Sequence, residues 1–164
     1  MSTQQDMDAA VRNEAAASAA PRIAFRPHHA LPWMILPQGM ALQVLIDAAP
    51  VAVPNTRPWF RGVISQGGNL VPVFDIAEWA GCARDPSTST QIVSIGQGAN
   101  ACAVLCCETP TLLRVGEPVG DAATAGALAP FAAHAYDSAL GKAHELDIQR
   151  WLAAAAAQVS AIDQ

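Results

Sequence analysis

Cysteine and histidine are the residues of this chain best suited to nucleophilic chemistry. Cys106 and Cys107 are adjacent, and His134 and His144 follow them. A cysteine enzyme needs a thiolate, which a basic neighbour or a helix N-terminus stabilises. No basic residue adjoins these cysteines in the sequence, and in a strand Cys102 and Cys106 would share one face with Cys107 opposite. The pattern therefore favours small apolar side chains packed inside a β structure.

Metal-ligating and acid–base chemistry have weaker support. His28 and His29 are adjacent, but structural zinc sites use paired ligands at short spacings and the chain has no Cys-x-x-Cys. Asp75 and Glu78 are the carboxylates near the clearest strand pair, where Asp75 is better placed to cap a short helix. We therefore predict no catalytic residue, no metal site and no cofactor, and hence a protein that is not an enzyme.

Composition narrows the class of protein further. Hydrophobic residues make up 52% of the 164 residues and charged residues 14%, which is typical of a globular domain. The net charge of −5 with scattered basic residues disfavours nucleic acid as a partner. Acidic residues within the first twenty positions and the lack of a long apolar run predict a cytoplasmic protein with reduced cysteines and no membrane insertion.

Short apolar runs separated by proline and glycine predict that the chain is mainly β. The clearest hairpin joins residues 62–66 and 70–74 through Gly67-Gly68-Asn69, which tolerates a tight turn. Pro72 cannot donate a ladder hydrogen bond, so its strand is expected at a sheet edge or a bulge. The other expected strands cover residues 22–25, 33–36, 42–46, 51–56, 91–95, 101–107, 111–115, 131–140 and 143–148.

Two helices and three segments complete the predicted organisation. A helical turn is expected over residues 75–79, and a C-terminal helix over 148–157 with Asp147 as its N-cap. A loop at residues 84–90 is expected to divide two subdomains. The predicted segments are a disordered tail over 1–20, a single domain over 21–158 and a C-terminal tail over 159–164.

Residues 55–76 carry a family resemblance. The stretch Gly62-Val63-Ile64, a glycine turn, and then Pro72-Val73-Phe74-Asp75-Ile76 resembles the signature of CheW-like domains. Trp59-Phe60 and the Gly-Asn-Leu-Val-Pro-Val run are similar to the PilI branch, which serves type IV pilus twitching motility. The resemblance extends over roughly residues 22–155, which is more than a single short motif gives by chance.

The resemblance implies a fold and a function. The fold would be two small five-stranded SH3-like β-barrels that share a core, with a C-terminal helix. The protein would be a non-enzymatic chemosensory adaptor, recruited to membrane-bound receptor arrays. Its partners would be the regulatory domain of a CheA-type histidine kinase, bound at a barrel edge, and the cytoplasmic tip of a methyl-accepting chemoreceptor, bound in the groove between the barrels.

The expected contact face comes from the hairpin and the strand before it. Two positions depart from the family pattern, because Gly67-Gly68 replaces the usual Arg-Gly and Gln43 replaces a common Glu. The face would therefore lose one positive and one negative charge, and such charges chiefly set specificity and association rate. The predicted contact residues are Gln43, Val44, Ile64, Gly67, Gly68, Asn69 and Val71.

Alternatives from other classes remain open on the sequence. One is a small-molecule-binding barrel or a cysteine-dependent enzyme that uses Cys106 or Cys107; another is a divergent member that binds the kinase but no receptor. Trp59 and Phe60 fit either an exposed anchor or the core, with at least one expected inside. The C-terminal helix fits a partner surface or a cover over the barrel.

Overall fold

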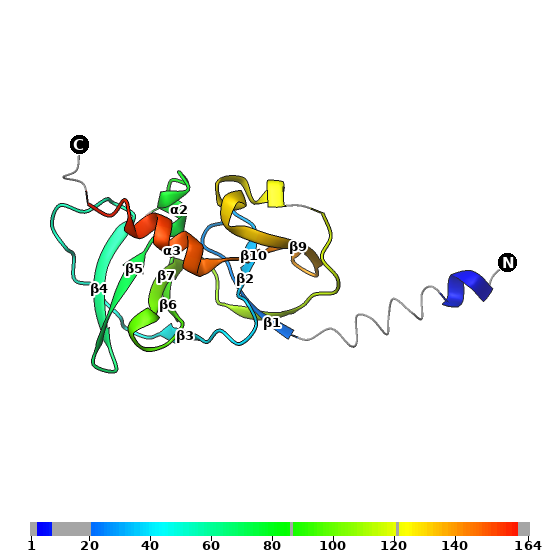
Figure 1. Cartoon of the computed structure of the whole chain (residues 1–164), viewed down its shortest axis with the longest axis horizontal. Helices are drawn as coiled ribbons and strands as arrows, with labels where there is room; N and C mark the ends of the chain where they lie inside the picture. The colour runs from blue at the N-terminus through cyan, green and yellow to red at the C-terminus, as the bar shows by residue number, and fades with distance from the viewer. Residues whose placement is uncertain (1–2, 8–20, 86, 121, 161–164) are drawn as a thin grey trace.

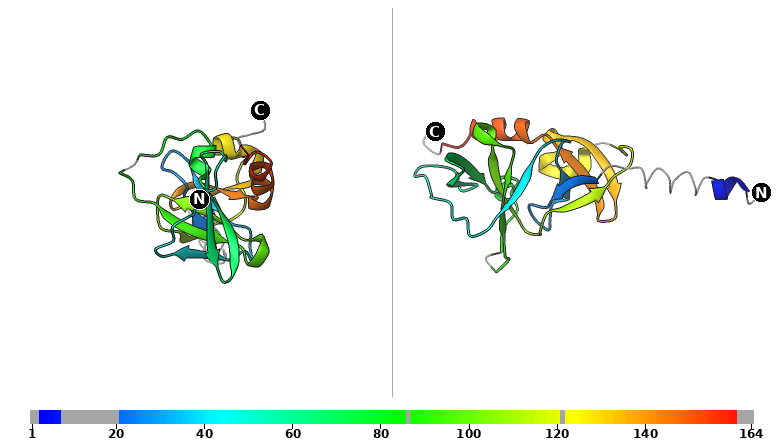
Figure 2. Two further views of the ribbon diagram at one scale, coloured as in Figure 1. Left: turned by 90° about the vertical axis from the view of Figure 1, so that its left-hand side faces the viewer. Right: turned by 90° about the horizontal axis from the view of Figure 1, so that it is seen from below.

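The computed structural model describes residues 3–7, 21–85, 87–120 and 122–160. Ten strands form two five-stranded sheets that lie side by side (Figures 1 and 2). We call them the terminal sheet and the central sheet. The terminal sheet has the order β8-β1-β2-β10-β9, with β1 (Pro21–Phe25), β2 (Trp33–Ile35), β8 (Thr111–Arg114), β9 (Ala132–Ser138) and β10 (Gly141–Leu146). The central sheet has the order β3-β6-β7-β5-β4, with β3 (Leu42–Leu45), β4 (Phe60–Gln66), β5 (Asn69–Phe74), β6 (Gln91–Ile95) and β7 (Cys102–Cys106).

The division between the two sheets differs from the prediction. Residues 84–90 lie between β5 and β6, inside the central sheet, so they do not separate two subdomains. The chain crosses between the sheets instead after β2 and after β7. The first two strands and the last three share the terminal sheet, because β1 pairs with β8 and β10 pairs in parallel with β2. Such non-local pairing leaves no local signal in the sequence.

The β4–β5 hairpin confirms the predicted turn and corrects the expectation for Pro72. Gly67 and Gly68 both have positive φ, as a two-residue hairpin turn requires. β5 is not an edge strand, since it lies between β4 and β7. Alternation from the turn makes Val63 and Pro72 a non-hydrogen-bonded pair, and pairing with β7 begins only at Val73. The missing N–H of Pro72 therefore breaks no ladder bond.

Both predicted helices form with the predicted caps. Asp75 accepts a hydrogen bond from the Glu78 amide at the start of α2 (Ile76–Trp79), and Asp147 accepts one from the Arg150 amide at the start of α3 (Ile148–Ala156). Two 3₁₀ segments, η1 (Gly98–Asn100) and η2 (Ala122–Phe131), lie in stretches without predicted structure. The last hairpin turns at residues 139–140, whereas the expected strands over 131–140 and 143–148 would place the turn at residues 141–142.

One hydrophobic core joins the two sheets, and α3 closes it. Met34 and Leu146 of the terminal sheet share a buried cluster with Phe74 and Val104 of the central sheet. The apolar face of α3, formed by Ile148, Trp151 and Ala155, is buried in the same cluster, and from the end of β10 the helix runs over the central sheet (Figure 1). Of the two alternatives for this helix, a partner surface or a cover over the barrel, the buried apolar face therefore supports the cover.

The chain ends only partly follow the prediction. Residues 3–7 are helical, while the rest of the predicted N-terminal tail lies outside the described residues. Val159 accepts a hydrogen bond from the Arg57 amide and Ser160 bridges to Thr56, so residues 159–160 belong to the folded domain and not to a tail. In the described part of the chain, no helix is long and apolar enough to cross a membrane.

Candidate protein-binding surface

The outer strands of the central sheet approach each other along a line that we call the seam, between β3 and β4. Gln66 donates to the Gln43 carbonyl oxygen at 3.0 Å and accepts from the Ser94 hydroxyl at 2.8 Å. These side chains join two strands that form no backbone ladder with each other. Gln43, where the family often has a glutamate, therefore links the two edges through a neutral hydrogen bond.

The seam opens into a groove of about 680 Å³ between β3, the following loop and β4. Its apolar lining is strongly exposed, with Ile46 at 86%, Val51 at 68% and Leu70 at 74%. Clustered exposed apolar side chains mark sites of protein contact. We did not predict Ile46, Val51 or Leu70 as contacts, although Leu70 stands next to the buried Val71 and so makes both faces of β5 apolar.

The structure separates the seven predicted contact residues into two groups. Gln43, Val44, Gly67, Gly68 and Asn69 are exposed. Ile64 and Val71 are paired across β4 and β5 and are buried in the central sheet, at 7% and 1% exposure. Strand alternation turns most of both side chains inward, although Ile64 still lines the groove beside the seam and Val71 lines a smaller neighbouring one.

A glycine fixes the loop that borders the seam. Val51 exchanges two backbone hydrogen bonds with Val63, at 2.8 and 3.0 Å, which covers part of the β4 edge. Gly62 has φ of +118° at a register shift in β4, and a Cβ there would lie 2.1 Å from the Val51 carbonyl oxygen. Only glycine allows this close approach. The Gly62 of the family-like motif therefore positions the loop that carries Ile46 and Val51.

A second groove, of about 480 Å³, lies between the two sheets, and we call it the inter-sheet groove. Ile23 of β1, Leu42 and Val44 of β3, and Leu112 of β8 line it, together with Pro110 and Thr111. Leu112 is 65% exposed and Val44 is 39% exposed. β3 therefore borders both grooves, and Leu112 is a further residue that the sequence did not single out.

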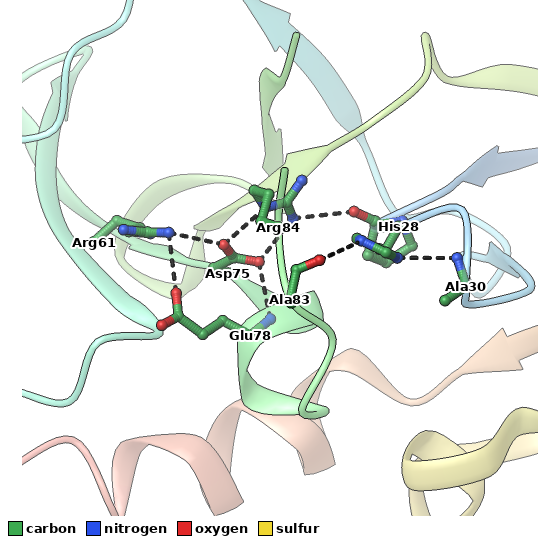
Figure 3. Close-up of polar contacts among 8 residues, drawn as sticks. His28, Ala30, Arg61, Asp75, Glu78, Ala83 and Arg84 are labelled. Carbon is green, nitrogen blue, oxygen red and sulfur yellow. Dashed lines mark hydrogen bonds and ion pairs between the residues drawn. The ribbon is translucent and has the colours of Figure 1, made fainter. Parts of the chain in front are cut away.

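A buried carboxylate holds the region behind the seam (Figure 3). Asp75 is fully buried and bonds Arg84 through both oxygens, at 2.7 and 3.0 Å, while Arg61 reaches it at 3.1 Å. Arg84 also donates to the Pro27 carbonyl, which ties this network to the β1–β2 loop. Burial alone would raise the pKa of Asp75, but Arg84, the Glu78 amide and Arg61 outweigh it and lower this pKa.

The aromatic pair at the start of β4 contributes to the core. Trp59 and Phe60 are partly buried, and both rings contact Phe74, at centroid distances of 6.3 and 5.4 Å. At least one of the two was expected in the core, and both pack against it. Phe60 also lines a shallow apolar groove beside Leu152 of α3.

The cysteines lack the features of a nucleophile. Burial raises the pKa of both Cys102 and Cys106 to about 12, and burial followed by Glu108 raises that of Cys107. No basic residue adjoins these cysteines in the sequence, but folding brings Arg84 close to Cys106, and Arg26 and Arg84 close to Cys107. Their charges are outweighed by desolvation, so these thiols are protonated at neutral pH.

We expect alkylation at pH 7 to separate the cysteines by burial. Cys102 and Cys106 should react roughly a thousandfold more slowly than free cysteine, since a pKa of about 12 against about 8.5 lowers the thiolate fraction by that factor. The half-buried Cys82 and Cys107 should be modified first. Mass spectrometry after timed iodoacetamide treatment measures this order. Rapid, selective labelling of Cys106 would revive the alternative of a cysteine enzyme.

Fold and surface together define a class of protein: a small β scaffold of two joined sheets that presents open apolar grooves. Residues 40–133, more than half of the chain, match the family model of the CheW-like domain. The chain therefore belongs to the CheW-like family.

Comparison with solved structures agrees with this fold. The scaffolding protein TtCheW from Thermoanaerobacter tengcongensis is similar with a TM-score of 0.61 and 15% identity. The match covers 78% of this chain and 88% of that one. At this identity the likeness concerns the fold alone. No curated protein matches the sequence.

Proposed function

We propose that this protein is a cytoplasmic, non-enzymatic adaptor that couples a methyl-accepting chemoreceptor to a CheA-type histidine kinase. The observation that carries the proposal is the pair of apolar grooves on either side of β3, on a module of the CheW-like family. One small domain with two adjacent binding surfaces can hold two partners together without any chemistry. Each bound partner raises the effective concentration of the other, which allows weak interfaces to build an ordered assembly.

Each groove suits a different kind of partner. The inter-sheet groove is lined mainly by aliphatic side chains from three strands, and an amphipathic helix such as a receptor tip binds by laying its apolar face into such a groove. The seam combines exposed strand margins with Ile46, Val51 and Leu70, which suits the β surface of a kinase regulatory domain. We therefore assign the receptor to the inter-sheet groove and the kinase to the seam.

The contact residues proposed for the kinase follow from this assignment. Gln43, Gly67, Gly68 and Asn69 lie at or beside the seam, while Val44 borders both grooves. Gly67 and Gln43 are uncharged where the family pattern has charged residues, so the seam carries no charge at these two positions. Apolar contact then supplies more of the affinity, and the association rate depends less on ionic strength than with charged residues there.

Two single substitutions test the assignment. Leu112→Asp should weaken binding of a receptor cytoplasmic fragment by about tenfold or more and leave kinase binding intact, because it places a charge in the inter-sheet groove. Leu70→Asp should have the opposite selectivity. Leu140→Asp, at an exposed apolar position in the β9–β10 turn, is the matched control. Biolayer interferometry with purified partners measures the affinities, and unchanged binding of both partners by both variants would overturn the proposal.

We further propose that the output is twitching motility driven by type IV pili. The support is the similarity of Trp59-Phe60 and the run from Gly68 to Val73 to the PilI branch. Deletion of the gene should then abolish surface twitching and spare flagellar swimming. The reverse pattern would place the protein in a flagellar system.

A further inference from the structure

Three different metal-binding side chains converge at the edge of the molecule where the two sheets meet. The ligand atoms of His29, Cys107 and Glu108 all lie within 4.8 Å of one another. His29 belongs to the β1–β2 loop, and the other two residues follow β7 of the central sheet. No metal site is predicted at His28 and His29 because the chain has no paired ligands at short spacing, and 78 residues separate His29 from Cys107. Folding removes that separation.

The backbone around the three side chains is held in place by hydrogen bonds. The Cys107 amide donates to the Arg26 carbonyl at 3.0 Å, which joins the two segments directly. Arg26 in turn donates to the carbonyls of Leu31 and His29, at 3.0 and 2.9 Å. His28 accepts from the Ala30 amide at 2.9 Å, and its other ring nitrogen lies 3.1 Å from the Ala83 carbonyl oxygen, so both nitrogens already have partners. The backbone that carries His29 is therefore held in place before any ligand binds, while its exposed side chain can still rotate.

The donor set identifies the class of ligand. A thiolate, an imidazole and a carboxylate are together the donors of zinc sites, at bond lengths of about 2.0–2.3 Å. Tetrahedral coordination would bring the three ligand atoms to within roughly 3.5 Å of one another. Since all three side chains are at least partly exposed, small rotations at the surface supply this approach. We propose that His29, Cys107 and Glu108 form a binding site for Zn²⁺, with a fourth position open to water.

The surrounding charges are compatible with a divalent cation. Glu108 already contacts the His29 ring at 3.3 Å, and Arg26 approaches the same carboxylate oxygen at 3.5 Å. Arg26 is committed to loop carbonyls through two other nitrogens, so its contact with Glu108 is the longer one. The second oxygen of Glu108 has no contact among those described and can face the metal. With the thiol deprotonated, two negative ligands would offset the Arg26 charge, and Arg84, which also lies near Cys107, is already paired with Asp75.

The position of the site predicts its consequence. A bound ion would link the β1–β2 loop of the terminal sheet to the end of β7 in the central sheet. Glu108 also lies two residues before Pro110, which lines the inter-sheet groove. Metal binding should therefore stabilise the contact between the sheets and raise the melting temperature, because the ion binds the folded state alone.

Cobalt titration of the full chain tests the site without any reference to receptor or kinase binding. In a reducing buffer without chelator, Co²⁺ should bind one to one and produce a thiolate-to-cobalt charge-transfer band, and Zn²⁺ should displace it. Cys107→Ser, His29→Ala and Glu108→Gln should each weaken binding by about tenfold or more. Cys82→Ser and His28→Ala, which change a second half-buried thiol and the neighbouring imidazole, are the matched controls.

The outcomes separate clearly. Loss of the band in Cys107→Ser with unchanged controls, together with a Zn²⁺-dependent rise in melting temperature in the wild type, supports the site. An equal affinity of the wild type and Cys107→Ser overturns it, as does loss of the band in Cys82→Ser or the lack of any thiolate band. Circular dichroism of every variant checks that the fold is retained.

Discussion

Replacing Trp151 with alanine should lower the free energy of unfolding by about 3–5 kcal/mol, the range for truncating a large buried aromatic side chain. Trp151 is fully buried on α3, and its ring meets Phe74 and Trp79 edge to face at centroid distances of 5.4 and 5.7 Å. It belongs to the core cluster that includes strands of both sheets. Its removal would leave a cavity where the sheets join.

Denaturant unfolding followed by far-UV circular dichroism measures this loss. Gln149→Ala, an exposed change on the same helix, should alter stability by less than about 0.5 kcal/mol. Trp151→Phe should fall between the two, since it keeps one ring of the aromatic group. A loss below about 1 kcal/mol for Trp151→Ala would mean that α3 does not close the shared core.

Replacing Asp75 with alanine should cost about 3–5 kcal/mol, because it leaves Arg84 with a buried and uncompensated charge. The Arg84 side chain is 12% exposed, and Asp75 is its bidentate partner. The substitution also removes the N-cap of α2. Glu78→Ala is the control, since it removes a half-exposed ion pair with Arg61 that contributes at most about 1 kcal/mol. Equal losses in the two variants would show that the Asp75–Arg84 pair adds nothing of its own.

The pH dependence of stability checks the same carboxylate independently. The pKa of Asp75 is lower in the folded protein than its ordinary value of 3.8, so the folded state favours the charged form. Its stabilising effect is therefore fully present above about pH 5 and is lost as the pH falls through the folded-state pKa. Asp75→Asn keeps the shape of the side chain and should reduce the dependence of stability on pH below pH 4. An unchanged acid limb would contradict this role.

The candidate surface illustrates how strand alternation limits prediction. The hairpin at residues 60–74 was placed correctly, and with it Gly67, Gly68 and Asn69 on the exposed turn. Ile64 and Val71 are also predicted contacts, but their side chains lie on the buried face of the central sheet and are 7% and 1% exposed. Which face of an apolar strand is buried depends on the element that packs against it. In β5 both faces carry apolar residues, so only packing could distinguish Val71 from Leu70.

The sequence by itself determined the local elements and the family, because turn glycines, helix caps and apolar runs act over a few residues. Asp75, Asp147 and the Gly67-Gly68 turn all have the roles that their neighbours predict. Tertiary structure alone decided which strands share a sheet, where the two grooves lie, and that His29 meets Cys107. These features depend on contacts between residues that are far apart in the chain. The free energy of each such contact is set by the packing of the whole domain.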